Sequence, residues 1–309
     1  MQPLSNNMIT RIIFGILLFF YLSGCDNTNQ DKSNDIKSGE LAVVDDLGDT
    51  LYFNQPPAKI VTLAPNLTEI IYALGAGDRL VGNTKFCNYP PEAVDIQNVG
   101  DLLTVNYELI SAIKPDLIFI TIEGNKKEVY DRLKQLGNKV FISNPRDYEG
   151  IKKTLSDIAL ITGKTHIADS LIKVWDQDVE KCRSANFYKN SLNVMFMVSA
   201  NPVMLAGENT FVNEYLKMLG LKNIAVGVPM NYPLFSREKI YDIDPDFIFY
   251  PGMEKNVKEN VVGLYPEWRE LRVFREDNFI TLDPDLFYRP GPRFTEALKE
   301  LKNVIDRRL

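Results

Sequence analysis

The chain is poor in the residues that most catalytic and metal sites use. Its 309 residues include a single histidine, His166, and three cysteines that form no CxxC pair. The sequence also lacks GxSxG, HExxH, a phosphate-binding loop and a complete dinucleotide-binding fingerprint. Acid–base chemistry would therefore rest on carboxylates, and no pair of them is marked out by its spacing. These absences argue against an enzyme and against a metal site built from protein ligands.

Positive charge is scarce as well. Lysine and arginine together number 35 against 41 acidic residues, which gives a net charge of −6 without any basic block. A mildly acidic chain of this kind is poorly suited to bind the phosphate backbone of a nucleic acid. We therefore expect no nucleic-acid partner.

The apolar run at residues 12–22 is shorter than the about 20 residues that a membrane-spanning helix needs. It fits the core of a signal peptide. The run ends in LSGC, whose cysteine is Cys25, and this box resembles the lipobox of bacterial lipoproteins. The alternative is an ordinary secretory signal with a cysteine by chance. We predict a lipoprotein signal peptide over residues 1–24 and lipidation of Cys25. The exported protein would then be lipid-anchored to the cell membrane at its periplasmic or extracytoplasmic face.

Residues 25–40 are rich in Asp, Asn, Ser and Lys and show no apolar periodicity. Such a composition cannot bury enough apolar surface to offset the entropy of ordering the chain. We predict a lipidated flexible tether over this range. Asp26 follows the cysteine directly and resembles the inner-membrane retention signal of enteric bacteria, but the sequence leaves open which membrane carries the anchor.

The first folded unit reads as a hairpin followed by a strand, a tight turn and a helix. Residues 41–53 place apolar residues on both sides of a turn cluster, DDLGD, which predicts a β-hairpin. Residues 60–63 are typical of a short buried strand. Residues 66–69, NLTE, resemble a capping box in which the asparagine caps the helix and the glutamate reaches back. Gly75 fits the end of that helix.

Two motifs recur in the same order along the chain. NYELISAIKPDLIFI (106–120) matches SREKIYDIDPDFIFY (236–250) at seven of fifteen positions. Each predicts a short capped helix, a Pro-Asp stop and a buried strand. EIIYALGAGDRLVG (69–82) matches EYLKMLGLKNIAVG (214–227), and each predicts a helix closed by Leu-Gly and a strand ending in Val-Gly. Repeats in one order indicate two lobes of similar α/β build.

The segment between the repeats, residues 148–189, is charged and helical in period with a break at Gly163. It predicts one helix before the break and a longer one after it. These could be surface helices of a single domain, but the flanking repeats favour a helical strut between lobes. We therefore expect an N-terminal lobe with hairpin at 41–147, a strut at 148–189 and a C-terminal lobe at 190–309. The ligand would lie in the cleft between lobes, near the carboxyl ends of strands.

Several segments together resemble a known family. AKIVTLAPNLTEIIYALGAGDRLVG, NYPPEA, VGDLL, the two Pro-Asp motifs and YRPGPRFTEAL look like the periplasmic binding proteins for iron-siderophores and cobalamin, from about Leu41 to the C-terminus. The resemblance implies an α/β fold of two Rossmann-like lobes joined by a long inter-lobe helix, with limited opening. It also implies a monomeric substrate-binding lipoprotein, not an enzyme, that delivers a small metal chelate to an ATP-binding-cassette permease in the membrane.

The combination of APNLTE, NYPPEA and RPGPR looks most like the cobalamin-binding subgroup. A corrinoid needs aromatic walls and scattered hydrogen-bond donors. The residues that the resemblance assigns to ligand binding are Asn88, Tyr89, Leu102, Asn201, Tyr232, Phe287, Tyr288 and Arg289. Both tryptophans, Trp175 and Trp268, lie outside these loops, unlike those of many cobalamin binders in the family. A ferric siderophore or haem is therefore the alternative ligand, and a membrane-anchored enzyme or an adhesion lipoprotein ranks lower.

Glu108 and Glu238 lie in the first turn of matching helices. A carboxylate there complements the helix dipole, whereas the resemblance implies that each forms a salt bridge to an arginine of the permease.

Arg289 could bind carboxylate, phosphate or hydroxamate oxygens with its fork of donors. Arg293 is interpreted as a structural residue. Cys87 is interpreted as a small half-buried residue and His166 as a surface position on a helix.

Overall fold

The computed structural model describes residues 40–184, 188 and 191–309, and Glu40–Leu309 forms one compact unit. The predictions for the signal peptide, the tether up to residue 39 and the lipidation of Cys25 lie outside the described residues. Within the described ranges, no helix combines the length and the apolar character needed to cross a bilayer.

The unit begins with the predicted β-hairpin, which the structure confirms. Strands β1 (Leu41–Val44) and β2 (Thr50–Phe53) pair antiparallel. The Asp45 carboxylate closes their turn by accepting the backbone N–H groups of Leu47 and Asp49, each at 2.9 Å. Its second oxygen accepts the backbone N–H of Ile142 at 3.3 Å. One buried aspartate therefore shapes the turn and ties the hairpin to the neighbouring sheet.

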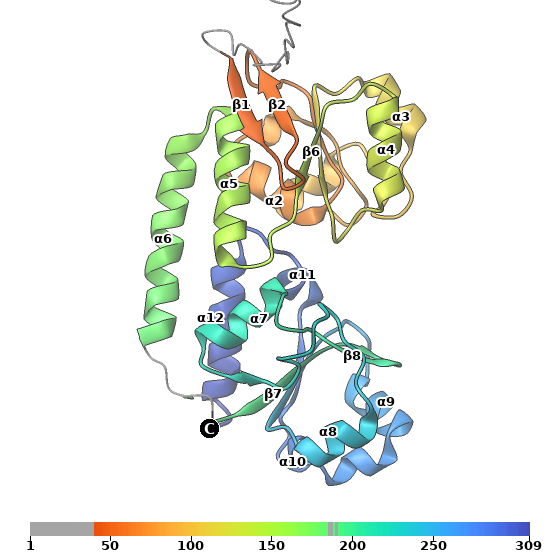
Figure 1. Ribbon diagram of the computed structural model, residues 1–309, viewed down its shortest axis with the longest axis vertical. Helices are drawn as coiled ribbons and strands as arrows, with labels where there is room; N and C mark the ends of the chain where they lie inside the picture. Colours follow the sequence, from red (N-terminus) through yellow and green to blue (C-terminus); the bar gives the residue numbers. More distant parts are fainter. Residues whose placement is uncertain (1–39, 185–187, 189–190) are drawn as a thin grey trace, which may run out of the picture. The chain divides into compact units, whose positions relative to one another are not determined.

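The N-terminal lobe is a four-stranded parallel sheet with helices packed on it (Figure 1). In sheet order its strands are β4 (Leu80–Gly82), β3 (Ile60–Thr62), β5 (Leu117–Thr121) and β6 (Val140–Ser143). Its helices are α2 (Pro65–Ala73), α3 (Tyr107–Ile113), α4 (Lys127–Gln135) and α5 (Tyr148–Thr162), with 3-10 turns η1 (Gly77–Arg79) and η2 (Pro91–Asp95). Every residue of β3, β5 and β6 is buried, as expected for a parallel sheet that is covered on both faces.

The C-terminal lobe has a sheet of the same kind with one antiparallel addition. Its order is β11 (Phe279–Leu282), β10 (Phe247–Pro251), β7 (Asn193–Ala200) and β8 (Val203–Leu205), and β9 (Lys222–Asn223) also pairs with β7. Only β8 runs antiparallel to its neighbour. The helical elements are α7 (Phe211–Met218), α8 (Arg237–Ile243), α9 (Val257–Leu264), η3 (Pro266–Glu270), α10 (Arg272–Arg275), α11 (Pro284–Phe287) and α12 (Phe294–Asp306).

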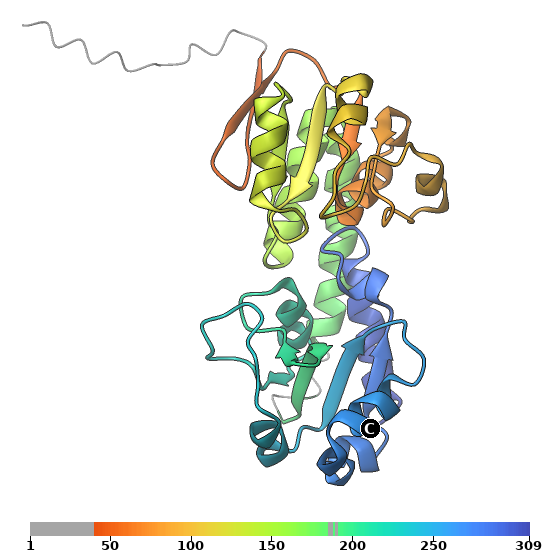
Figure 2. The ribbon, with the colours of Figure 1, turned by 90° about the vertical axis from the view of Figure 1, so that its right-hand side faces the viewer.

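Two antiparallel helices connect the lobes, with the predicted break at Gly163 (φ +72°). Helix α5 packs on β1 and α2 of the N-terminal lobe. Helix α6 (Thr165–Ser184) runs back along α5 and then packs on α7 and α12 of the C-terminal lobe (Figures 1 and 2). At 1.5 Å per residue its 20 residues extend about 30 Å. The fold is thus the expected pair of α/β lobes with a long inter-lobe helix, and α6 is the helix that spans both.

The first repeated motif folds the same way in both lobes. The side chain of Asn106 caps α3 by accepting the N–H of Leu109 at 2.9 Å, and that of Ser236 caps α8 by accepting the N–H of Lys239 at 3.2 Å. Each helix then ends at a left-handed residue, with φ +53° at position 114 and +49° at position 244. A buried strand follows each Pro-Asp pair, β5 in one lobe and β10 in the other. The predicted helix, stop and strand are confirmed twice.

The second motif folds alike only in its helix. Helices α2 and α7 both close on a glycine of positive φ, Gly75 at +68° and Gly220 at +67°. Strand β4 then ends at Gly82 as predicted, but β9 ends at Asn223 and the Val-Gly pair at 226–227 lies in a turn. The prediction of a strand there was wrong because the Asn223 side chain accepts the N–H of Ala225 at 3.0 Å and turns the chain.

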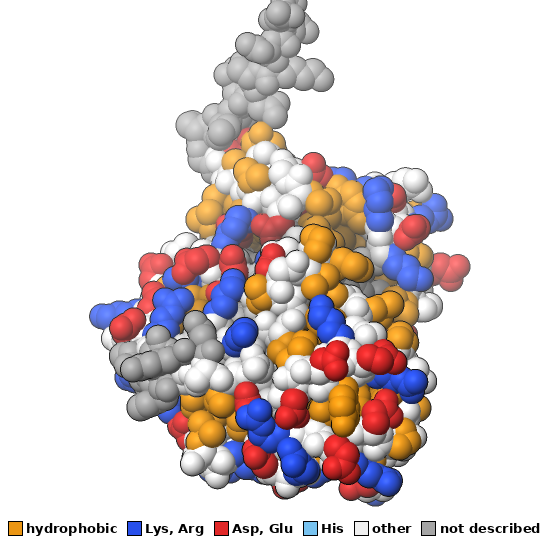
Figure 3. All heavy atoms as spheres, turned by 60° about the horizontal axis from the view of Figure 1, so that its bottom comes forward, with side chains coloured by type: hydrophobic (Ala, Val, Ile, Leu, Met, Phe, Trp, Pro, Cys, Tyr) orange, Lys and Arg blue, Asp and Glu red, His pale blue; other side chains and the backbone are white. Residues whose placement is uncertain are grey.

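Acidic and basic side chains are interspersed on the face that Figure 3 presents, with apolar side chains between them. On that face the charged side chains of the two signs alternate and neither sign gathers into one large patch.

Candidate ligand-binding site

A cavity of about 480 Å³ opens between the lobes. On the N-terminal side it is lined by residues that follow β3, β5 and β6, so it lies where the carboxyl ends of these parallel strands meet. The lining residues of that lobe are Ala64, Pro65, Asn66, Phe86, Leu102, Thr121, Glu123, Gly124, Asn144 and Pro145. Those of the other lobe are Val198, Phe211, Tyr232, Pro284, Asp285, Tyr288, Arg289 and Pro290.

Four of the eight residues expected to bind ligand line this cavity: Leu102, Tyr232, Tyr288 and Arg289. Asn88, Tyr89, Asn201 and Phe287 are not among its lining residues. Asn201 is exposed in the turn between β7 and β8. The prediction for Phe287 needs correction, because its side chain is wholly buried and packs on the rings of Phe196 and Tyr215. It supports the wall from behind and offers a ligand no surface.

Aromatic side chains from both lobes form much of the wall. Phe86 comes from the N-terminal lobe, and Phe211, Tyr232 and Tyr288 come from the C-terminal lobe. Burial and the nearby Glu123 carboxylate raise the pKa of Tyr232 well above its ordinary value, and burial raises the pKa of Tyr288. Both hydroxyl groups are therefore neutral at physiological pH.

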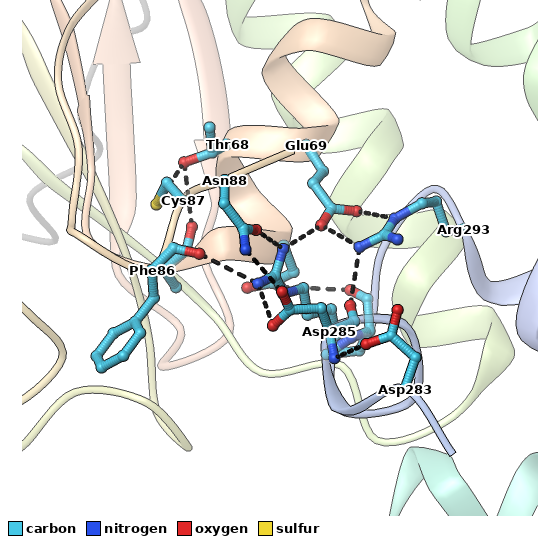
Figure 4. A network of polar contacts seen from close by, with 12 residues as sticks. Thr68, Glu69, Phe86, Cys87, Asn88, Asp283, Asp285 and Arg293 are labelled. Carbon is cyan, nitrogen blue, oxygen red and sulfur yellow. Dashed lines mark hydrogen bonds and ion pairs between the residues drawn. The ribbon is translucent and has the colours of Figure 1, made fainter. Parts of the chain in front are cut away.

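A buried ion-pair network, which we call the floor, adjoins the cavity through the lining residues Asp285 and Arg289; Figure 4 shows its contacts. Its centre is Glu69 of α2, whose side chain is 1% exposed and accepts from Arg289 at 2.9 Å and from Arg293 at 2.7 and 2.9 Å. The capping box predicted for this helix was therefore wrong. Ala64 is the N-cap residue, Glu69 faces the two arginines, and the Asn66 amide donates to the carbonyl of Pro290 at 3.3 Å.

Both terminal nitrogens of Arg289 are occupied within this network. Besides Glu69, its guanidinium donates to the Asn88 side chain at 2.8 Å, to the Phe86 carbonyl at 3.1 Å and to the Asp285 carboxylate at 2.5 Å. Asn88 in turn donates to Asp285 at 2.7 Å. Arg289 thus touches the cavity mainly as a positioning residue, because its charge is already balanced by two carboxylates. It holds the 86–88 loop and the segment after β11 against α2.

Tyr89 belongs to the same floor. Its ring lies 4.1 Å from the guanidinium carbon of Arg293, a cation–π contact that covers the second arginine. Cys87 beside it is a free thiol, 3% exposed, and its sulfur accepts from the Thr68 hydroxyl at 3.1 Å. It is more deeply buried than the sequence predicted. His166 is exposed on α6 as expected, and no cluster of metal-ligating side chains occurs among the described residues.

The polar lining residues that the sequence did not predict include Glu123 and Asn144. Each follows a completely buried strand, β5 and β6 respectively. Glu123 forms an ion pair with Arg146 and accepts the Tyr232 hydroxyl at 3.2 and 3.3 Å, which is a direct contact between the two lobes. The rule that polar residues after parallel strands meet at one edge could have found both.

The two glutamates expected to dock on a permease lie at matching places. Glu108 and Glu238 are exposed in the first turn of α3 and of α8. The N–H at the start of α8 and the neighbouring Arg237 hold the pKa of Glu238 below its ordinary value. The Glu238 carboxylate is therefore charged at neutral pH, and both glutamate side chains are accessible to a partner.

Two parallel-sheet lobes around a cavity at the carboxyl ends of their strands, joined by one long helix, define a two-lobed solute-binding protein. A protein-family model described as a periplasmic binding protein matches residues 60–286. The uncharacterized ABC transporter substrate-binding lipoprotein YvrC of Bacillus subtilis is 29% identical over 303 residues, covering 94% of each chain. A vitamin B12-binding protein of Vibrio cholerae is 26% identical over 250 residues, covering 80% of this chain and 88% of its own.

A solved structure agrees with these relatives. The periplasmic vitamin B12 binding protein BtuF of Vibrio cholerae superimposes with a TM-score of 0.70 at 25% identity, covering 82% of this chain and 98% of its own. The chain belongs to the periplasmic binding protein family whose members bind iron-siderophores, vitamin B12 or haem. It is an extracytoplasmic substrate-binding protein of an ABC transporter, which implies a permease and a small ligand as partners, and the family is not enzymatic.

Proposed function

We propose that this protein captures a corrinoid such as cobalamin in the cavity between its lobes and delivers it to the permease. One observation carries the proposal: the cavity combines aromatic walls with polar groups but offers no uncommitted positive charge. Arg289 is the one cation among the lining residues that the structure describes, and two carboxylates and two carbonyl oxygens occupy it. A large ligand with an apolar rim and neutral amides suits such a lining.

The charge of the lining disfavours an anionic ligand. The lining residues carry two negative charges, on Glu123 and Asp285, and one positive charge, on Arg289. Asp285 pairs with Arg289 and Glu123 pairs with Arg146, so neither arginine is left unpaired. The propionates of haem and the acid groups of an anionic siderophore bind best to unpaired arginine or lysine. Placing them beside Glu123 and Asp285 would cost Coulomb energy in a partly desolvated site.

The tyrosines of the cavity also fit a corrinoid better than ferric haem. Tyrosine holds haem iron as the phenolate. Burial raises the pKa of Tyr232 and of Tyr288, so both favour the neutral hydroxyl. A neutral hydroxyl serves instead as a hydrogen-bond partner for an amide.

A ferric hydroxamate siderophore that is neutral or cationic is the second candidate. The same observation favours it, because the carboxylates of Glu123 and Asp285 would attract a positive side chain. Its oxygen-rich surface is less apolar than the rim of a corrinoid and makes poorer use of the aromatic wall.

The other roles follow from this proposal. Leu102, Tyr232 and Tyr288 would contact the ligand, while Arg289, Asn88 and Tyr89 would position the floor. Glu108 and Glu238 would dock on the permease, and Cys25 would carry the lipid at the end of the tether. The lobes at 41–147 and 190–309 would each supply one wall, with residues 148–189 as the connection.

Calorimetric titration of the purified protein with cyanocobalamin, a ferric trihydroxamate and haem tests the proposal. One-to-one binding of cyanocobalamin, at least tenfold tighter than the other two, is the expected result. Tyr288→Ala should then weaken binding by about tenfold or more, because a buried aromatic contact is lost. Tyr241→Ala, which removes an exposed tyrosine of α8, is the matched control. Preferential binding of haem or the hydroxamate would refute the corrinoid assignment.

A further inference from the structure

Two hydrogen-bond acceptors line the N-terminal wall of the cavity, one just after each of two neighbouring strands. Strands β5 and β6 are parallel neighbours whose last residues, Thr121 and Ser143, lie in register. The backbone N–H of Ile122 donates to the Ser143 carbonyl at 3.2 Å, so the strand ends stay together. Glu123 is the second residue after β5 and Asn144 the first residue after β6, and both line the cavity. We call these two residues the acceptor wall.

Glu123 retains room for a further donor. Its carboxylate pairs with Arg146 and accepts the hydroxyl of Tyr232, while its side chain remains 26% exposed. A carboxylate has about four acceptor positions, which these two partners do not exhaust. A donor on a ligand would therefore add to the carboxylate, or replace Tyr232 on it.

Asn144 supplies the independent observation. The side-chain oxygen Oδ1 is buried and has no hydrogen-bond partner among the described residues, although nearly all buried acceptors in folded proteins have one. The same side chain lines the cavity although Oδ1 itself is closed off from it, so a rotation of the Asn144 side chain on ligand binding would bring this oxygen to a donor. An unmatched acceptor at this place is explained if a bound ligand supplies the missing donor.

We propose that the acceptor wall of Glu123 and Asn144 binds an N–H donor of the ligand and makes the cleft selective for neutral or cationic ligands over anionic ones. This inference rests on the proposed function in one respect: the N–H donor is taken to be a peripheral primary amide of a corrinoid. A primary amide has two N–H groups and could satisfy both acceptors at once. A ligand carboxylate in the same place would offer no N–H group to these acceptors, and its negative charge would be repelled by that of Glu123.

Corrinoids with a single altered amide provide the test. The wild-type protein is titrated with cyanocobalamin and with the separate isomers in which one peripheral amide is hydrolysed to a carboxylate. For at least one isomer the affinity should fall by about 10- to 100-fold, because a charge-assisted hydrogen bond is replaced by repulsion. Equal affinity for the amide and for every isomer would overturn the proposal.

Variants then assign the effect to the wall. Glu123→Gln should weaken cyanocobalamin binding by about tenfold and shrink the penalty of that same isomer by about tenfold, because the repelling charge is gone. Asn144→Leu removes the unmatched acceptor at similar volume and should weaken the amide form more than the carboxylate form. Glu128→Gln, the same change at an exposed site in the first turn of α4, should match wild type. If Glu123→Gln weakens all probes equally, its role is structural and the proposal fails.

The acceptor wall is separable from the corrinoid assignment. If wild type binds ferric trihydroxamates and no corrinoid, the proposed function fails, and the wall is tested with a trihydroxamate that ends in an ammonium and its analogue that ends in a carboxylate. The ammonium form should bind about tenfold more tightly or better, and Glu123→Gln should remove that preference. No preference in wild type would refute the wall itself. Thermal unfolding of each variant verifies that the fold is intact.

Discussion

Glu69 and Glu214 occupy the same place in the repeated motif, yet their surroundings differ completely. Glu69 of α2 has a side chain that is 1% exposed and lies between Arg289 and Arg293. Glu214 of α7 lies near the surface and pairs with Lys217 one turn on, at 2.9 Å. Both helices end at a glycine of nearly equal φ. The repeated sequence therefore fixes the helix and its end, while the partner brought by the rest of the fold decides what the glutamate does.

The largest expected effect comes from removing this difference. Glu69→Gln should lower the free energy of unfolding by about 3–5 kcal/mol, because two buried guanidinium groups lose their shared carboxylate. Glu214→Gln should stay within about 0.5 kcal/mol, as expected for a surface ion pair. Urea unfolding followed by the fluorescence of the buried Trp175 and Trp268 measures both. If both variants lost the same free energy of unfolding, the buried network at Glu69 would stabilise the fold no more than a surface ion pair does.

Glu108 of α3 and Glu238 of α8, in contrast, should have the same role in both lobes, which is to dock on the permease. Charge reversal in the double variant Glu108→Lys, Glu238→Lys should reduce transport by about 100-fold, because like charges would meet at the permease. Ligand affinity of the purified protein should not change. Glu128→Lys, in the first turn of another exposed helix, is the control for the helix dipole. Uptake by reconstituted permease is the measurement, and loss of ligand binding in the double variant would contradict docking.

The aspartates of the two Pro-Asp pairs also differ in burial between the lobes, and we expect a smaller difference in stability from them. Asp246 is 7% exposed and accepts the N–H of Asn193 at 2.7 Å, besides pairing with Arg272. Asp116 is exposed and accepts two backbone N–H groups at 2.8 Å each. Asp246→Ala should lower the free energy of unfolding by about 2 kcal/mol and Asp116→Ala by about 1 kcal/mol. The difference arises because water can replace the lost carboxylate at the exposed site but not at the buried one. The reverse order in urea unfolding would refute this reasoning.

The smallest effect concerns how α6 holds the C-terminal lobe. The hydrogen bond from Lys299 of α12 to Asp178 holds the pKa of that carboxyl below its ordinary value. A lowered pKa adds stability above the unfolded pKa of about 3.9, and that stability is lost as the pH falls through the folded value. Asp178→Asn should therefore cost about 0.5 kcal/mol at pH 7 and nothing near pH 2. A cost that is the same at both pH values in urea unfolding would exclude the ion pair as its source.

Much of the scaffold could be predicted because its signals are local. The turn cluster of the hairpin, the caps at Asn106 and Ser236 and the break at Gly163 act within a few residues, so the sequence states them directly. The two lobes followed from repetition. Local patterns also misled: the NLTE box looked like a cap, and the second Val-Gly pair looked like the end of a strand, because nothing nearby reveals a distant partner.

The site was less predictable for the same reason. Leu102, Tyr232, Tyr288 and Arg289 line the cavity, but the side chain of Phe287, which precedes Tyr288, is buried in the core. In a short helix neighbouring side chains point in different directions, so a family motif fixes the segment without fixing which side chain faces the cleft. Glu123 and Asn144 carry no motif at all and are recognised only once β5 and β6 are seen to be neighbours.

The sequence by itself determined the class of fold, the order of the elements, the repeated lobes and the expectation of a binding protein. The helices and strands rest on periodicity, caps and stops, which depend on residues within one or two turns of each other, whereas the two lobes rest on the repeated motifs and the binding role on the family resemblance. Only the tertiary structure decided that Glu69 pairs with two arginines more than 200 residues away and that the acceptor wall lines the cavity. A buried ionic group is stable only when an oppositely charged partner lies beside it. Because these partners are far away in the sequence, no local pattern could predict which charges of the cleft would be paired.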